Sequence, residues 1–251
     1  MVEDCSRGEL LGWQEFVGTY LSIARRLLLH YFPTLAPELD AHLTRLCRHA
    51  RENGNAWFAE LRFANEREFL MELRALVFAY ARAAARVPAP AFSLEQAQEL
   101  LHDLSVVHRE LLWMFVKGYD AAHTADMLMN AEATSGELNQ RTRDRIAQVV
   151  ERGASDLLLA AEKASTPDCL PLKTFNNLIN GQISWQERDE AERHFRDCLY
   201  CLDRFTSFQE MIWYGRNAPP LGEPQVQRIL RELGLSLKKK GLVARLFSKS
   251  A

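Results

Sequence analysis

Four residues in the last third of the chain have the types and spacing of a metal site. They form the pattern Cys169-x24-His194-x3-Cys198-x2-Cys201. His194 and Cys198 are four residues apart, so on a helix they lie on one face, one turn from each other. The Cys-x-x-Cys spacing lets two thiolates share one ion, and Cys169 can complete a tetrahedron from a separate segment. Three thiolates and one imidazole suit a structural Zn²⁺, which has no open position once four protein ligands bind it.

Other interpretations of these residues are open. They can be unrelated buried thiols and a surface imidazole, although three of the five cysteines at ligand spacing favour a metal. A Cys–His nucleophilic pair is less favoured because no basic or oxyanion partner is evident. A redox pair formed by Cys198 and Cys201 would need a disulfide substrate and a metal-free active form. We therefore expect that the protein is not an enzyme.

Local helix signals place the predicted ligands on a helical hairpin. Residues 170–179 can form a short helix. Ser184 and Glu187 form a capping box that starts the next helix, which carries His194 near its C-terminal end. The module at 165–215 is too small for a large core, so metal binding would supply part of its folding free energy.

The composition is that of an ordinary globular chain. Apolar residues make up 47% and charged residues 25% of the 251 residues, which excludes a disordered or supercharged protein. No apolar run approaches the roughly 18 residues that span a bilayer, and the acidic residues 1–4 do not begin a secretory signal. We therefore expect a cytoplasmic protein whose cysteines are thiols or metal ligands. Gly-rich phosphate loops and serine-nucleophile elbows are also missing.

Proline-bearing breaks divide the chain into three modules and a tail. Within the modules, apolar residues recur at three- and four-residue spacing, and no segment alternates apolar and polar residues long enough to demand a strand. The sequence therefore predicts an all-α protein. The expected parts are a helical domain at 1–88, a second at 92–163, the metal module at 165–215, and a linker with a basic tail at 216–251.

The second module has the pattern of a helix-turn-helix. Leu104 to Phe115 has an apolar face, Asp120 can cap a helix over 121–129, and Thr134 opens a third helix with another capping box. In such a fold the third helix lies in the major groove, where arginine reads guanine and Asn or Gln reads adenine. The predicted DNA-binding residues are Thr134, Asn139, Gln140, Arg141, Arg143 and Arg145. A solvated helix face is the alternative, and the net charge of −5 over 89–163 favours it.

The metal-ligand pattern resembles the zinc-binding anti-sigma domain. The resemblance includes the sequence Leu-Ile-Asn-Gly-Gln-Ile-Ser at 178–184, which matches a turn before that family's ligand helix. It implies a helical domain that masks the polymerase-binding surfaces of a sigma factor. In some members the thiolates also sense oxidation by releasing the metal.

Leu104 through Leu128 resembles region 4 of sigma-70-family factors of the extracytoplasmic-function type. The matching positions are Arg109, Glu110, Gly118, Ala125 and Leu128. Thr134 falls where the family's recognition helix begins. The basic stretch that follows in the family is replaced by Ser-Gly-Glu-Leu at 135–138, so two basic positions are lost at the DNA-facing end.

Residues 1–88 resemble sigma region 2, with helices expected at about 8–31, 35–53 and 66–86. Asp40 lies near the aspartate that begins the family's polymerase-binding helix, and Phe69 falls in its promoter-melting frame. Glu72 replaces the usual tryptophan, and Leu43-Thr44 replaces an acidic pair. Phe78 and Tyr80 could stack on unpaired bases, although aromatic residues at helical spacing are more often core.

The tail at 216–251 holds the basic excess, with a net charge of +6. A short amphipathic helix with Val226 and Ile229 is followed by three lysines at 238–240, Arg245 and interspersed apolar residues. Such a segment can contact anionic lipid, DNA or an acidic protein face, including the acidic second module of this chain. A solubilising end is an equal alternative.

Taken together, the resemblances imply a sigma-factor-like transcription regulator controlled in cis by a fused zinc anti-sigma-like module. Its implied partners are core RNA polymerase and promoter DNA, and it would hold an intramolecular sigma-like/anti-sigma-like contact. Tethering gives such a contact an effective concentration on the order of mM. The rival hypothesis is a protein–protein adaptor, derived from this architecture, that no longer recognises promoters. The missing docking and recognition residues favour that rival.

Overall fold

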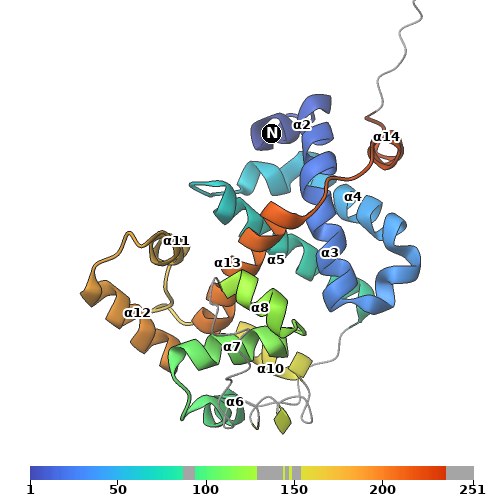
Figure 1. The fold of residues 1–251 in the computed structure, drawn as a ribbon. Coiled ribbons are helices and arrows are strands. Elements are labelled where there is room, and N and C mark those ends of the chain that lie inside the picture. The colour runs from blue at the N-terminus through green and yellow to red at the C-terminus, as the bar shows by residue number, and fades with distance from the viewer. Residues whose placement is uncertain (87–93, 129–143, 145–146, 149–153, 236–251) are drawn as a thin grey trace, which may run out of the picture. The chain divides into compact units, whose positions relative to one another are not determined.

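The computed structural model describes residues 1–86, 94–128, 144, 147–148 and 154–235. Helices account for 80% of the structure and the described residues contain no strand, which confirms the all-α class (Figure 1). The described elements are α1 (Val2–Ser6), α2 (Leu10–Glu15), a π-helix η1 (Phe16–Tyr20), α3 (Leu21–Tyr31), a 3-10 helix η2 (Pro33–Glu38), α4 (Leu39–Glu60), α5 (Glu66–Ala85), α6 (Leu94–Leu101), α7 (Val106–Val116), α8 (Ala121–Leu128), α10 (Ala154–Glu162), α11 (Leu172–Asn180), α12 (Trp185–Asp197), α13 (Leu199–Asn217) and α14 (Glu223–Glu232).

The chain separates into two compact units. The first holds Met1–Leu61 together with the segment from Ala218 onward, and the second holds Arg62–Asn217. The boundaries of these units differ from the boundaries of the predicted functional domains, because α5 lies in the second unit and α14 lies in the first. The functional domains stay a prediction.

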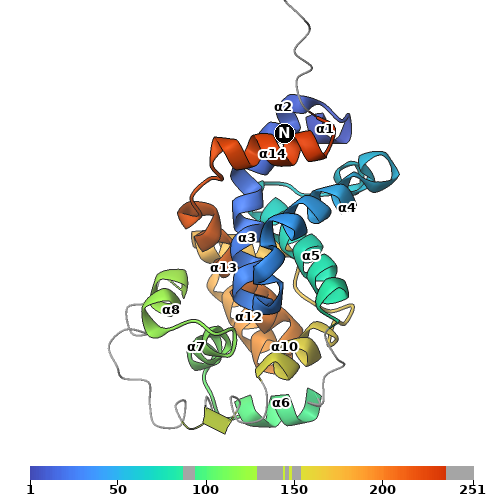
Figure 2. The same ribbon diagram turned by 90° about the vertical axis from the view of Figure 1, so that its right-hand side faces the viewer.

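In the first unit, aromatic rings from α2, η1 and α4 form the centre of the core. Phe58 meets the rings of Trp13 and Phe16 edge to face, with centroids 5.2 and 5.1 Å apart. The helix expected at 8–31 is interrupted by η1, whose wider turn leaves the Gly18 carbonyl to accept a hydrogen bond of 3.0 Å from the Leu221 backbone N–H. That bond holds the segment before α14 beside the N-terminal helices (Figure 2).

The helix expected at 35–53 begins in η2 and continues as α4 to a sharp break at its expected end, after which a further helical turn runs to Glu60. Asn53, Gly54 and Asn55 all have positive φ, at 54°, 73° and 66°. Asn and Gly are the residue types that tolerate this left-handed conformation. The break redirects the last turn of α4, and that turn carries Phe58 into the core.

In the second unit, α13 is the central helix. It packs against α5, α7, α8, α10 and α12 (Figure 1). Nearly all its residues from Leu199 to Tyr214 are buried, polar ones included. The helices expected at 66–86, 121–129 and 170–179 appear as α5, α8 and α11 within a few residues. The unit therefore places the predicted metal module and the predicted helix-turn-helix helices around α13, which contributes residues to two hydrophobic clusters.

Candidate metal centre and the buried network beside it

The four predicted ligands come together. The sulfur atoms of Cys169, Cys198 and Cys201 and an imidazole nitrogen of His194 all lie within 4.8 Å of one another. The Cys169 and Cys198 sulfurs are 3.8 Å apart, and His194 Nε2 lies 3.2 Å from the Cys201 sulfur. Two thiolates on a tetrahedral zinc, each about 2.3 Å from the ion, are separated by about 3.8 Å. The geometry is thus compatible with one zinc ion.

Two helix ends and one turn position these side chains. His194 lies in the last turn of α12, Cys198 is the residue that ends that helix, and Cys201 lies in the first turn of α13. The Cys198 N–H donates to the His194 carbonyl at 2.8 Å, which fixes the end of α12. Cys169 lies in the turn before α11, where its N–H donates to the Thr166 carbonyl. At the other end of α12, the predicted capping box of Ser184 and Glu187 is present.

Backbone amides surround the sulfur atoms. The Leu170 N–H donates to the Cys201 sulfur at 3.2 Å, and the Thr166 N–H donates to the Cys169 sulfur at the same distance. The Cys201 N–H points at the Cys198 sulfur, 3.5 Å away. Donors of this kind stabilise negative charge on sulfur and orient metal ligands. The turns around the site therefore suit thiolates.

The lowered pKa of Cys198 distinguishes this ligand from the two cysteines outside the site. The hydrogen bond from the Cys201 thiol lowers the pKa of Cys198 to about 5, and the same bond raises the pKa of Cys201, the donor. One thiol of this pair thus ionises readily, and a bound cation would deprotonate the others. Burial raises the pKa of Cys5 to about 12 and raises that of Cys47 as well. Those two cysteines are inert core residues.

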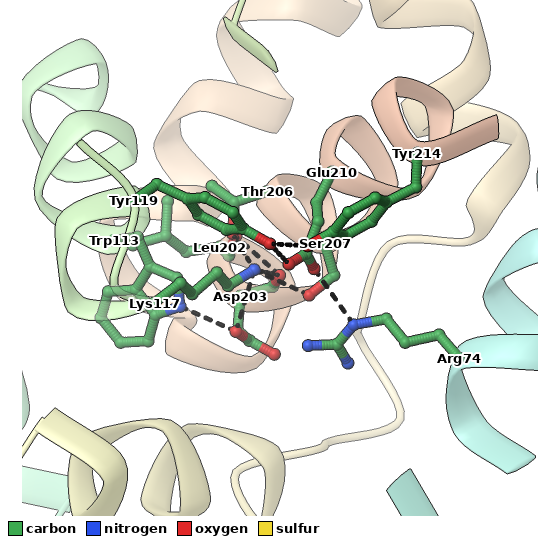
Figure 3. A network of polar contacts seen from close by, with 10 residues as sticks. All are labelled: Arg74, Trp113, Lys117, Tyr119, Leu202, Asp203, Thr206, Ser207, Glu210 and Tyr214. Carbon is green, nitrogen blue, oxygen red and sulfur yellow. Dashed lines mark hydrogen bonds and ion pairs between the residues drawn. The ribbon is translucent and has the colours of Figure 1, made fainter. Parts of the chain in front are cut away.

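A network of buried polar side chains lies on α13, directly after the metal site (Figure 3). The Lys117 ammonium is fully buried and lies 3.4 Å from an Asp203 carboxylate oxygen. It also donates to the hydroxyls of Thr206 and Ser207, both at 2.8 Å. The Trp113 indole N–H donates to Asp203 at 2.8 Å. Burial alone would raise the pKa of Asp203, but the ammonium beside it holds that pKa below its usual value.

One turn further along α13, Glu210 continues the network. Its carboxylate is fully buried and accepts hydrogen bonds from the Arg74 guanidinium of α5, at 3.3 Å, and from the Tyr119 hydroxyl. The Tyr119 and Tyr214 hydroxyls lie 2.9 Å apart (Figure 3). Buried charged and polar side chains thereby connect three parts of the unit, which are α5, α13, and α7 with the residues after it.

Sequence reasoning missed this network. Arg74 and Glu210 are 136 positions apart, and Lys117 and Ser207 are 90 positions apart, so no local pattern reports their contact. The available signal was Asp203 and Glu210 themselves, two acids inside a helix that also carries Leu, Phe, Met, Ile and Trp. A carboxylate in such a segment needs a buried partner.

The predicted DNA-binding residues fall in a part of the chain that the structure does not describe. Thr134, Asn139, Gln140, Arg141, Arg143 and Arg145 lie outside the described residues. The helices before them begin with side-chain caps, of which the one at Asp120 was predicted. Ser105 accepts a hydrogen bond from the His108 N–H at the start of α7, and Asp120 accepts one from the His123 N–H at the start of α8.

Two residues singled out by the resemblance are in the core. Arg109 is buried and donates to the carbonyls of Leu104, His102 and Arg196, so it ties α7 to the end of α12. Phe78 is buried with the Arg74 guanidinium 4.0 Å above its ring. The core interpretation of Phe78 is therefore confirmed.

None of the described helices combines the length and the apolar character that crossing a bilayer requires. No protein-family model, curated protein or solved structure matches this chain, so the donor set and its surroundings are the basis for inferring a function.

Proposed function

We propose that the protein is a sigma-factor-like transcription regulator whose polymerase- and DNA-binding parts are held closed in cis by a fused zinc module. The observation that carries the proposal is the position of α13. This helix starts at the candidate metal site, and its buried side chains are bonded to α5 and α7. By the resemblance, α5 belongs to the region 2-like part and α7 to the region 4-like part.

The metal would control how firmly α13 is held. Cys198 ends α12 and Cys201 begins α13, so one ion bound to both fixes the junction of the two helices. Asp203, which binds Lys117 and Trp113, follows two residues later. Loss of the ion would release the first turn of α13 and weaken its hold on α7. Oxidation, metal loss or binding of a partner shifts the equilibrium between the closed and open states only if it stabilises one state more than the other.

A protein–protein adaptor is the second candidate, and the two core residues favour it. Phe78 is covered by Arg74, and Arg109 is used to hold α12, so neither side chain is presented to a nucleic acid. In an adaptor the same metal-dependent closure would control access to a protein partner. The adaptor would bind neither promoter DNA nor polymerase in any metal state.

The decisive experiment compares capture by core RNA polymerase for the full chain in metal-loaded and metal-stripped form. Deleting 165–217 is unsuitable because α13 is the centre of its unit, so Cys198→Ser serves instead. Cys5→Ala is the matched control, because Cys5 is a buried thiol outside the site. We expect the metal-stripped chain and Cys198→Ser to bind polymerase at least about fivefold more tightly than the loaded chain, a coupling typical of two-state control.

Binding to promoter-like duplex should rise in parallel and fall with added salt, because phosphate contacts release counterions. If neither polymerase nor duplex binds to any of the four proteins, the transcription proposal is wrong and the adaptor is favoured. Equal binding by the loaded and stripped chains would contradict control by the metal.

A further inference from the structure

The helix that leads into the candidate metal site, α12, ends with two backbone carbonyls that side chains of other helices bind. The last carbonyls of a helix have no partner within the helix and need one elsewhere. The carbonyl of Arg196 accepts a hydrogen bond from the side chain of Arg109 on α7. The carbonyl of Asp197 accepts one of 3.2 Å from Nε2 of Gln98 on α6. Both carbonyls belong to the two residues directly before Cys198, so the bonds hold the turn that carries this ligand.

The Arg109 side chain is itself held firmly. It is 4% exposed, and its guanidinium also donates to the carbonyl of Leu104 at 3.0 Å and to the carbonyl of His102 at 3.2 Å. One planar guanidinium thus serves three carbonyls, which the single ammonium group of a lysine cannot reproduce. The end of α12 therefore has a fixed position relative to α7 and to the segment before it.

Cys198 is the single residue that joins α12 to α13. Its backbone is extended, with φ −117° and ψ 100°. Its N–H donates to the His194 carbonyl at 2.8 Å, and its carbonyl accepts from the Leu202 N–H at 3.1 Å. Rotation of the last peptide units of α12 would turn the Cys198 sulfur away from the Cys169 sulfur, which lies 3.8 Å from it. Groups that orient metal ligands from outside the coordination shell change metal affinity by about 10–100-fold.

We propose that Arg109 and Gln98 are positioning residues of the metal site, which hold the last turn of α12 so that the Cys198 sulfur faces the ion. The inference rests on the metal binding in the function proposed above, and it adds that α6 and α7 set the metal affinity. Because coupling between two binding events is reciprocal, a partner that draws α7 away from α12 lowers the metal affinity. The bound ion opposes that movement by the same factor.

The first test replaces Arg109 in the full chain by lysine, which keeps the charge. The metal-free chain is titrated with Co²⁺ against a competing chelator, and the visible absorption of cobalt bound to thiolates reports binding. Circular dichroism compares the helicity of the metal-free chains. We expect Arg109→Lys to weaken Co²⁺ binding at least about tenfold, because the lysine cannot serve all three carbonyls. An unchanged affinity would overturn the proposal.

The second test uses Gln98, which is exposed, so that its substitution leaves the core intact. Gln98→Met keeps the length of the side chain but removes the donor, and it should weaken Co²⁺ binding about threefold. Gln98→Arg offers a donor again at the C-terminal end of α12 and should restore the parent affinity. This series decides the question if Arg109→Lys does not fold.

Gln186→Met is the matched control. Gln186 donates to Glu190 at the opposite end of α12, so this variant weakens the same helix without changing the turn that carries the ligand. We expect it to bind Co²⁺ like the parent. Equal affinities of Gln98→Met and the parent would contradict the positioning role. An equal loss in Gln98→Met and Gln186→Met, or no recovery in Gln98→Arg, would show that only the stability of α12 matters and would also contradict it.

These outcomes are distinct from failure of the proposed function. If the parent chain binds neither Zn²⁺ nor Co²⁺, the metal site is wrong and the positioning roles are wrong with it. If polymerase capture fails while the affinities shift as expected, the transcription proposal is wrong and the roles of Arg109 and Gln98 stand.

Discussion

At the residue scale, the second unit buries several charged side chains among its described residues. Lys117 and Glu210 are fully buried, and each is bonded to several partners rather than one. A buried charge is stable only when such partners offset its desolvation. Removing one of these charged side chains therefore lowers the free energy of unfolding by more than the lost bond contributes, because the remaining buried charge has no partner.

Lys117→Met tests this at the residue scale. The substitution keeps a long apolar side chain but leaves Asp203 without its ammonium partner. We expect a loss of about 3–5 kcal/mol in the free energy of unfolding, measured by urea denaturation of the metal-loaded chain. Adding Asp203→Leu should recover part of that loss. A cost below about 1 kcal/mol for Lys117→Met would show that the pair is solvent-screened.

Glu110 gives a pH-dependent prediction for the full chain. Its folded pKa, about 8, lies above its ordinary value of 4.5, so folding takes up a proton between these values. Stability from this group is complete below pH 4.5 and is lost as pH rises through 8. The gain from Glu110→Gln should therefore grow from below about 1 kcal/mol at pH 5 to on the order of 5 kcal/mol at pH 9. A gain that is equal at both pH values would contradict the raised pKa.

At the scale of elements, the helix signals that depend only on neighbouring residues are confirmed. The capping box at Ser184, the cap at Asp120 and the apolar stripe of α5 each act within a few residues, and all are present. The helix expected to end at 53 does end at the break over Asn53–Asn55, but the helical turn after the break and the π-turn at η1 were missed. The break brings Phe58 to α2, and η1 bonds the segment before α14.

Ser184→Ala tests the element that presents His194. The hydroxyl accepts the Glu187 N–H at the start of α12, so its loss should cost about 1 kcal/mol and lower the melting temperature by a few degrees. Glu187→Gln is the matched variant, since Gln also serves in a capping box and should cost less. Equal melting temperatures for Ser184→Ala and the parent would exclude a role for the cap in stability.

At the scale of the whole molecule, the four ligands lie in one unit and are drawn from three segments of it. The ligand set was predictable because three of its members lie within eight residues on a helix end, where spacing dictates geometry. The contacts that connect α13 with α5 and α7 were not predictable, since they join residues that are far apart in the sequence and meet only in the folded unit. Metal binding and packing of α13 are therefore expected to be coupled.

Chelation provides the test of that coupling. Because all ligands lie in the second unit, removing the metal should lower the thermal transition of that unit and reduce its helicity. The structure predicts two transitions in the stripped chain, with the one from the first unit unchanged. A single unshifted transition would contradict the coupling.

The most direct test of the central claim is the metal content of the purified chain, measured by elemental analysis. We expect about one zinc per chain, as a four-ligand site predicts. The zinc should be lost in Cys198→Ser and in His194→Ala and retained in Cys5→Ala. Zinc at full occupancy in the Cys169/Cys198/Cys201 triple serine variant would contradict the claim.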